Sequence, residues 1–143
     1  AGLFFWKEID KYQIGITTNS CSTMHKLAST PITMNCFEFN KLSDSNPIAE
    51  IIKMHRLSTI DYLERLRKSY HEITNKDIKN EIWKALIEDL PESWLQKRTV
   101  TMNYENVYNM FNQRLNHKLS EWSKDFIEWC ESLPYFKELF TDD

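Results

Sequence analysis

Closely spaced hydroxyl side chains and a histidine lie together in the segment from Ser20 to His25, which reads Ser-Cys-Ser-Thr-Met-His. Hydroxyl groups and an imidazole can donate hydrogen bonds to a phosphate or to the polar edge of a base. Ser22, Thr23 and His25 are therefore candidate ligand-binding residues. Two alternatives stay open. The serines are also good helix N-caps, and such an N-terminus itself attracts anions. A Ser–His catalytic pair is the other alternative, but no elbow glycines surround it.

A second group of polar residues consists of Asn103, Asn109 and Arg114. On a helix the step from Asn103 to Arg114 is close to about three whole turns, so these two residues share a face. Asn109 lies on the flank of that face. Such residues either line a ligand groove or are simply solvated on the side that faces away from the core.

The histidines give a third candidate. His117 and Glu121 are four residues apart, so a helix brings their side chains together. A carboxylate in that place favours the charged imidazole, in a binding site or in a surface pair. His55 and His71 have no such companions and are interpreted as structural or solvated. No spacing of cysteines or histidines indicates a metal site, and no residue is assigned as catalytic.

The elements that position these residues are predicted to be mainly helices. The first is a short helix over Leu3–Tyr12 with an aromatic face, followed by a β-branched strand or extended stretch over Ile14–Thr18. Residues 29 to 46 are expected to form a loop with one short helical turn. Ser45 or Asn46 should then cap a helix that has proline in its first turn and ends near residue 73.

Three amphipathic stripes follow, each with apolar residues three or four positions apart. Asn75 is expected to cap the first stripe, and Pro91 and Pro134 mark the ends of the first and the last. The stripes comprise Ile78, Ile82, Trp83, Leu86, Ile87 and Leu90, then Tyr104, Val107, Tyr108, Phe111 and Leu115, and finally Leu119, Trp122, Phe126, Trp129, Cys130 and Leu133.

Composition limits the function classes. The 143 residues include 2 glycines, Gly2 and Gly15, so the glycine loops that cradle phosphates are absent. The length suits a single domain over residues 1–143. A net charge of −3 gives no strong nucleic-acid signal, although a local basic patch is compatible with it. The sequence shows no apolar run that predicts a membrane span. The 3 cysteines are expected to be reduced thiols in a cytoplasm.

From Leu90 to Glu121 the sequence resembles the flavin-dependent thymidylate synthases. That family carries Leu-Pro, then Thr-x-Asn, then an Asn and an Arg on one helix, then His-Ala-Gln-x-Glu. His117 and Glu121 match after a one-residue deletion, and Ser20–His25 falls on the family's Arg-His-Arg-x-x-Ser-x-x-Glu-x-Ser-x-Arg signature. The residues that match without a gap are Leu90, Pro91, Thr101, Asn103, Asn109 and Arg114.

The resemblance implies the helical part of that family's α+β fold, with the family's leading strand-containing segment absent from this chain. It also implies that Asn103, Asn109 and His117 face FAD. Ser22, Thr23, His25 and Arg114 would face a nucleotide similar to dUMP. A homo-oligomer is expected, as a tetramer, because the family builds its sites between subunits. The pattern is similar to divergent phage-encoded relatives, which would work in the host cytoplasm.

The chain departs from the family where cations hold phosphate. Gln13, Ile14 and Gly15 stand in place of the Arg-His-Arg. Glu105 replaces a flavin-contacting arginine, and Ile87 replaces a substrate-contacting one. Charge-assisted hydrogen bonds are roughly twice as strong as neutral ones, so these losses bear directly on ligand binding.

The sequence therefore supports two different hypotheses about function. The first is a nucleotide-binding protein related to the enzymes that methylate dUMP reductively. The alternative is a non-catalytic phage interaction module that binds a host or phage protein; the lost arginines and the aromatic C-terminal region favour it. A plain helical domain with chance matches is the third interpretation.

Overall fold

The computed structural model describes residues 1–12, 14–20 and 26–140. Contacts divide the chain into two compact units. The terminal unit contains Leu3–Ser20 and the chain from Lys97 onward, and the hairpin unit contains residues 26–96. The single domain expected from the length stays a prediction.

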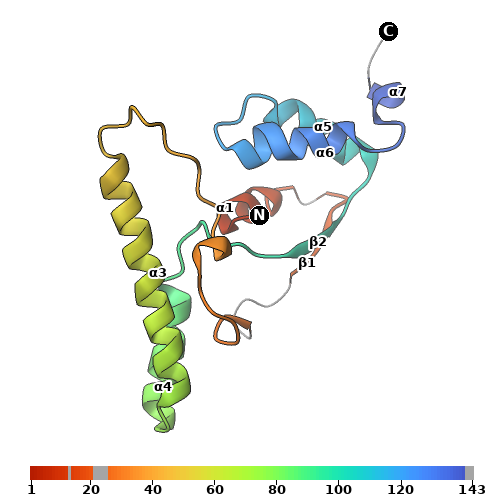
Figure 1. Cartoon of the computed structure of the whole chain (residues 1–143). Coiled ribbons are helices and arrows are strands. Elements are labelled where there is room, and N and C mark those ends of the chain that lie inside the picture. The colour runs from red at the N-terminus through yellow and green to blue at the C-terminus, as the bar shows by residue number, and fades with distance from the viewer. Residues whose placement is uncertain (13, 21–25, 141–143) are drawn as a thin grey trace. The chain divides into compact units, whose positions relative to one another are not determined.

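The terminal unit is mostly helical (Figure 1). Its sheet consists of two antiparallel strands, with Thr17 opposite Thr101 and Ser20 opposite Arg98. The mainly helical class is confirmed, because this is the one sheet among the described residues. The elements are α1 (Leu3–Ile9), β1 (Thr17–Ser20), β2 (Arg98–Thr101), α5 (Tyr104–Arg114), η2 (Glu121–Phe126), α6 (Ile127–Glu131) and α7 (Phe136–Phe140).

Trp122 is the centre of the core of the terminal unit. Its side chain is fully buried and stacks on Phe5 of α1, with ring centroids 4.1 Å apart. Phe126 meets the same indole edge-on at 5.0 Å. Met110 of α5 and Cys130 of α6 are also fully buried in this cluster. The second and third apolar stripes of the sequence therefore face a common core.

The last predicted helix is wound differently from the expectation. The stretch Glu121–Phe126 forms a π-helix, and regular α-helix resumes only in α6. Both Glu121 and Trp122 are buried, although they are neighbours in the sequence. A single α-helical stripe would have placed them on different faces.

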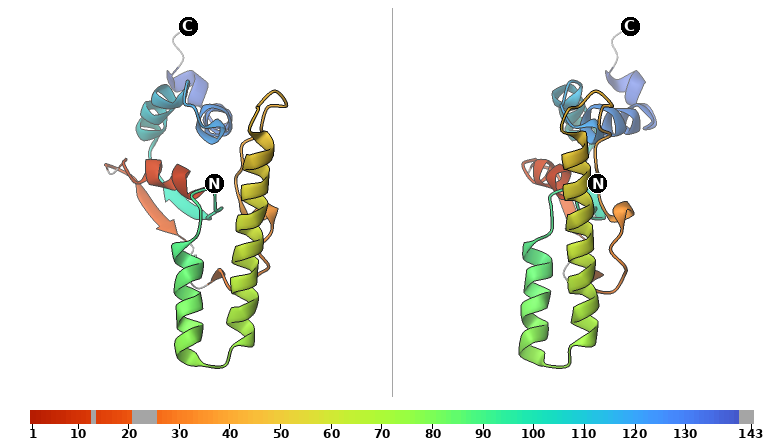
Figure 2. Two further views of the ribbon diagram at one scale, coloured as in Figure 1. Left: turned by 90° about the vertical axis from the view of Figure 1, so that its left-hand side faces the viewer. Right: turned by 60° about the vertical axis from the view of Figure 1, so that its left-hand side comes forward.

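The hairpin unit is built on two antiparallel helices, α3 (Ala49–Glu72) and α4 (Lys76–Glu88), which lie side by side in both views of Figure 2. Asn75 caps α4 as predicted, since its Oδ1 accepts hydrogen bonds from the backbone of Asp77 and Ile78 at 2.9 and 3.2 Å. The predicted single helical turn in the preceding loop is confirmed as η1 (Met34–Cys36).

The start of α3 is a correction. Ser45 or Asn46 was expected to cap this helix, but the residue at the cap is Ile48 and the helix begins at Ala49. Asn46 Oδ1 instead accepts a hydrogen bond from the backbone N–H of Ile48 at 3.0 Å, closing a turn across the intervening proline. The Asn46 side chain therefore stabilises this turn and does not cap α3.

The core of the hairpin unit joins both helices to the segment before them. Leu63 of α3 and Leu86 of α4 are fully buried, and Leu27, Ile32 and Phe37 pack against them. Leu86, the most buried residue of the predicted apolar stripe of α4, therefore packs in one cluster with Leu63 of α3.

Two negative findings hold for the described residues. No helix in this part of the chain combines the length and the apolar character that a membrane crossing requires. Across residues 1–12, 14–20 and 26–140 no three His, Cys, Asp or Glu side chains gather in a way that could hold a metal ion.

Candidate functional site

The predicted residue Asn103 has a structural task at the start of α5. Its backbone is extended and its Oδ1 accepts a hydrogen bond from the backbone N–H of Asn106 at 2.8 Å. This is the usual N-cap geometry, in which the side chain satisfies an otherwise unpaired helix donor. Asn103 therefore fixes where α5 begins and so sets the register of the polar residues that follow.

Amide side chains recur about every third residue along α5 and just beyond it. They form a polar face, which we call the amide face, and most of its members are exposed. Each amide offers two N–H donors and one carbonyl acceptor. The amide face comprises Asn106, Asn109, Asn112, Gln113 and Asn116.

The first pocket on the amide face is the Tyr12 hollow, with a volume of about 430 Å³. The Tyr12 hydroxyl donates a hydrogen bond to Gln113 Oε1 at 2.9 Å. The predicted residue Asn109 is exposed here, and no described residue hydrogen-bonds its side chain. The lining residues are Lys11, Tyr12, Ile14, Asn106, Asn109 and Gln113.

Gly15 borders this region in a conformation that favours glycine. Its φ is +72°, in the left-handed region. Asn106 Nδ2 donates a hydrogen bond to the Gly15 carbonyl at 3.2 Å, and a Cβ added to Gly15 would lie 2.8 Å from the same nitrogen. Any side chain at position 15 would therefore require the Asn106 amide to shift.

The second pocket, the His117 hollow, has a volume of about 600 Å³ and shares Gln113 with the first. The predicted residue His117 accepts a hydrogen bond on Nδ1 from the backbone N–H of Leu119 at 3.2 Å. A neutral ring in this arrangement carries its proton on Nε2. Glu121, which was a candidate for an exposed pair with His117, is instead buried in η2.

The predicted residue Arg114 lies in an ion pair. Its Nη2 donates a hydrogen bond to Glu8 Oε2 at 3.0 Å, and its side chain is 13% exposed. The guanidinium carbon lies 4.7 Å from the Trp122 ring centroid and 5.5 Å from that of Tyr12. Hydrogen bonds from Lys11 and Arg114 hold the pKa of Glu8 below its usual value. Glu8 therefore stays a carboxylate that competes with any anionic ligand.

One donor of Arg114 is not satisfied by the described part of the chain. Its Nε is buried and has no hydrogen-bond partner among the described residues, and the same holds for Nε1 of the adjacent Trp122. A buried donor without a partner costs about 1–3 kcal/mol, so native proteins usually supply a water or a ligand. The arginine thus retains one N–H for an acceptor other than the described residues, such as a water or a ligand.

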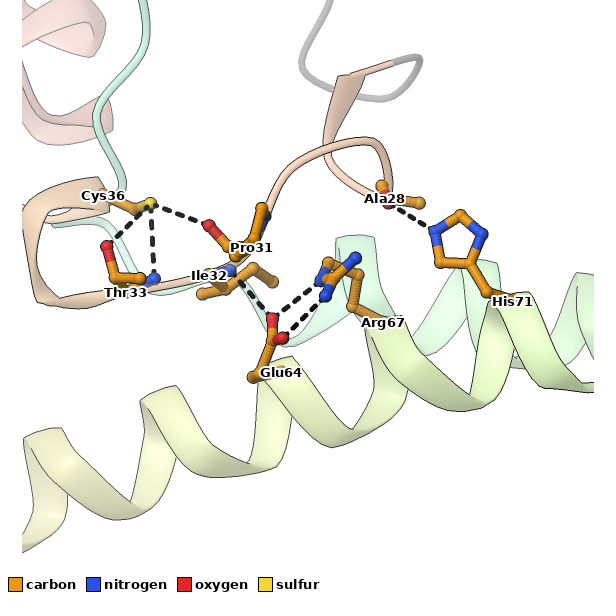
Figure 3. Close-up of polar contacts among 8 residues, drawn as sticks. All are labelled: Ala28, Pro31, Ile32, Thr33, Cys36, Glu64, Arg67 and His71. Carbon is orange, nitrogen blue, oxygen red and sulfur yellow. Dashed lines mark hydrogen bonds and ion pairs between the residues drawn. The ribbon is translucent and has the colours of Figure 1, made fainter.

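The candidates Ser22, Thr23 and His25 lie outside the described residues, but the segment that follows them is described (Figure 3). Glu64 Oε2 accepts a hydrogen bond from the backbone N–H of Ile32 at 2.8 Å, and His71 Nε2 donates one to the Ala28 carbonyl at 2.7 Å. His71 therefore has a structural role. Two side chains of α3 hold the chain just after residue 25.

The pKa of Glu64 leads to a prediction about acid stability. Two hydrogen bonds of 2.7 Å from Arg67, with help from the Ile32 N–H, lower this pKa from 4.5 to about 2. A lowered pKa stabilises the fold above the unfolded-state value, and that stability is lost as pH falls from about 4.5 through 2. We expect Glu64→Gln to remove on the order of 2 kcal/mol at neutral pH and to flatten this acid-dependent loss.

Urea unfolding at a series of pH values from neutral to acidic measures this effect. The matched control is Glu50→Gln on the same helix, because Glu50 pairs with Lys53 while 80% exposed. Exposed pairs contribute little, so the control should behave as the wild type. An equal response of the two variants would contradict the assignment.

The structure can now be compared with known proteins. No protein-family model and no curated protein matches the sequence significantly. Two crystal structures of the flavin-dependent thymidylate synthase ThyX from Helicobacter pylori with FAD and dUMP do match in fold, with TM-scores of 0.63 and 0.60. Each match covers 100% of this chain and 68% of the ThyX chain at 17% identity. The chain has the ThyX fold.

This finding confirms the fold that the resemblance implied, while the phage origin stays a prediction. In this fold Asn103 caps α5, Asn109 and Arg114 lie on that helix, and His117 follows it. The structure also adds Tyr12, Asn106 and Gln113, which the sequence analysis did not single out. The three-residue recurrence of asparagine along α5 was the signal that could have identified part of this set.

Proposed function

We propose that the terminal unit binds the planar ring of a nucleotide, a flavin or a uracil, in the Tyr12 hollow. The observation that carries this proposal is a pocket lined by amides on α5 of a ThyX fold, with Asn109 exposed in it. ThyX of Helicobacter pylori is seen with FAD and dUMP, which are the two ligands that we propose for this chain.

The chemistry of the lining suits such a ring. Flavin and uracil present alternating carbonyl acceptors and N–H donors along one edge, and an amide can satisfy either kind of group. Asn109 is available for this purpose because no described residue hydrogen-bonds its side chain. The half-buried Tyr12 supplies an aromatic ring beside it, and aromatic surface favours planar partners.

The phosphate of the ligand fits less well in the described part of the terminal unit. Arg114 is bound to Glu8, and Arg98 donates hydrogen bonds to Asp10 at 2.9 and 3.1 Å. A phosphate reaches Arg114 through the buried Nε or by displacing Glu8. We therefore propose that Arg114 contacts the ligand, and that this contact competes with the ion pair between Arg114 and Glu8.

The remaining predicted contacts are part of the same proposal. Ser22, Thr23 and His25 are proposed to hydrogen-bond a nucleotide, on the basis of their chemistry and their match to the family signature. Asn103 and His117 are proposed as contacts for the flavin. FAD, when bound, supplies the redox chemistry, and the residues of this chain bind and orient its ring.

Calorimetry with FAD and with dUMP tests the proposal. We expect heat of binding from at least one ligand. Asn109→Ala should bind about two- to thirteenfold more weakly, which is what the loss of one hydrogen bond of about 0.5–1.5 kcal/mol produces. Asn35→Ala removes an exposed asparagine of η1 in the other unit and is the matched control.

Absence of heat from both ligands would overturn nucleotide binding. If Asn109→Ala bound the ligand with the same affinity as the wild type, the placement of the ligand ring in the Tyr12 hollow would be overturned. Bound flavin in the purified protein would appear independently as an absorbance band near about 450 nm, a property of the cofactor.

A second candidate function is protein binding through α3. Ile51, Met54 and Leu57 are 68%, 69% and 57% exposed on this helix. Exposed apolar patches mark interaction surfaces in many proteins. We propose a second copy of this chain as the partner, in the homo-oligomer that the resemblance implies, with a host or phage protein as the alternative. Sedimentation of the wild type beside Ile51→Lys tests self-association, and a monomeric wild type would overturn it.

A further inference from the structure

A third pocket, which we call the lysine hollow, lies within the hairpin unit. One face of α4 supplies most of its lining, since residues 76, 79, 80 and 83 recur at helical spacing. Tyr70 of α3 completes it, and its volume is about 350 Å³, within the range of small-ligand pockets. The lining residues are Tyr70, Lys76, Lys79, Asn80 and Trp83.

Positive charge in the lysine hollow is not cancelled by its own helix. Among the described residues neither Lys76 nor Lys79 forms an ion pair with a carboxylate. The acidic residues of α4 lie roughly 100–140° around the helix axis from Lys76, on another face. These acidic residues are Asp77, Glu81 and Glu88.

Aromatic surface accompanies this charge. The Lys79 ammonium lies 4.7 Å from the centroid of the Tyr70 ring, and Trp83 lines the same pocket while half-buried. Cations beside aromatic rings form the usual surface for nucleotide units, since a base stacks on a ring and a phosphate pairs with a lysine. Asn80 adds an exposed amide that can bond a base edge.

We propose that the lysine hollow binds one nucleotide unit, with its base on Trp83 or Tyr70 and its phosphate on Lys76 and Lys79. The unit is either a free mononucleotide or part of a single strand. This site shares no residue with the Tyr12 and His117 hollows and does not depend on the function proposed for them. The net charge of −3 does not indicate this site, because the positive charge of the lysine hollow is a local feature of a chain with more acidic than basic residues.

The test uses AMP, inorganic phosphate and a short fluorescein-labelled oligo-dA at low salt. We expect AMP or the oligonucleotide to bind, and Lys76→Gln/Lys79→Gln to weaken that binding about tenfold or more and to reduce its salt dependence. Lys84→Gln on the same helix is the matched control, since position 84 lies about 80° around the axis from Lys76 and outside the lining.

A second variant addresses the ring. Trp83→Leu keeps an apolar side chain at a half-buried position, and it should weaken binding by about fivefold or more, as loss of base stacking does. Circular dichroism verifies its fold, and the lysine pair carries the test if that fold is lost. Asn109→Ala should leave this binding unchanged, which separates the lysine hollow from the Tyr12 hollow.

Several outcomes would overturn the proposal: no binding of either nucleotide probe, an equal loss in Lys84→Gln, or competition by inorganic phosphate as effective as that by AMP. The two nucleotide probes identify the source. Binding of the oligonucleotide without AMP indicates a single strand, and binding of AMP with similar affinity indicates a free mononucleotide.

Discussion

Trp122→Ala is expected to lower the free energy of unfolding of the terminal unit by about 3–5 kcal/mol, the usual cost of truncating a large aromatic side chain in a core. The indole is fully buried, stacks on Phe5 at 4.1 Å and receives Phe126 edge-on at 5.0 Å. Its removal leaves a cavity between α1 and η2 and takes away the ring over which the Arg114 guanidinium lies at 4.7 Å.

Amide hydrogen exchange of α5 under increasing urea measures this loss within the terminal unit. The control is Trp129→Ala in α6, where the same substitution removes a side chain that is 44% exposed and meets Phe126 only in a tilted contact at 5.6 Å. The control should lose about 1 kcal/mol or less, as expected for a partly exposed position away from the core. If both variants lost equal stability, Trp122 would not be the centre of this core.

Leu63→Ala is expected to destabilise the hairpin unit by about 2–5 kcal/mol. Leu63 is fully buried in α3 and belongs to the cluster that includes Leu86 of α4. The lost transfer free energy and the residual cavity add together, because packed helices relax only partly around a missing side chain.

The same unit provides a control outside the exposed face of α3 that we propose for self-association. Met34 of η1 is 45% exposed, so Met34→Ala removes little packing. We expect a change within about 0.5 kcal/mol. Hydrogen exchange of α4 distinguishes the two variants, and exchange that is accelerated equally in both would contradict the assignment of the core.

Local signals in the sequence were sufficient for most of the helices, although not for the cap of α3 or for the π-helical winding of η2. Asn75 capped α4 as predicted, and the apolar stripe of α4 did bury Leu86. β2 was not predicted, although Thr99 to Thr101 is β-branched, because its partner β1 lies far away in the sequence. A strand of this length has little local signature, since its hydrogen bonds come from the chain that pairs with it.

In the candidate site, too, residues close in the sequence could be predicted to lie together, whereas contacts between distant residues could not. The sequence placed Arg114 on a polar helix face, but its carboxylate partner Glu8 is 106 residues away. Tyr12 and Gln113, which both line the Tyr12 hollow, are 101 residues apart. Spacing along a helix cannot reveal such partners. The similarity to a known family anticipated the ThyX fold, even though the matching structures share only 17% identity.

Gly15 has a consequence for how this sequence can change over evolutionary time. An L-residue in the left-handed conformation costs roughly 1–2 kcal/mol, and here its Cβ would also collide with the amide of Asn106. Any L-residue at position 15 therefore carries this conformational cost and also requires the Asn106 side chain to shift. The two positions are therefore energetically coupled: we expect a substitution of Gly15 to cost less in a chain whose residue 106 has a smaller side chain than asparagine.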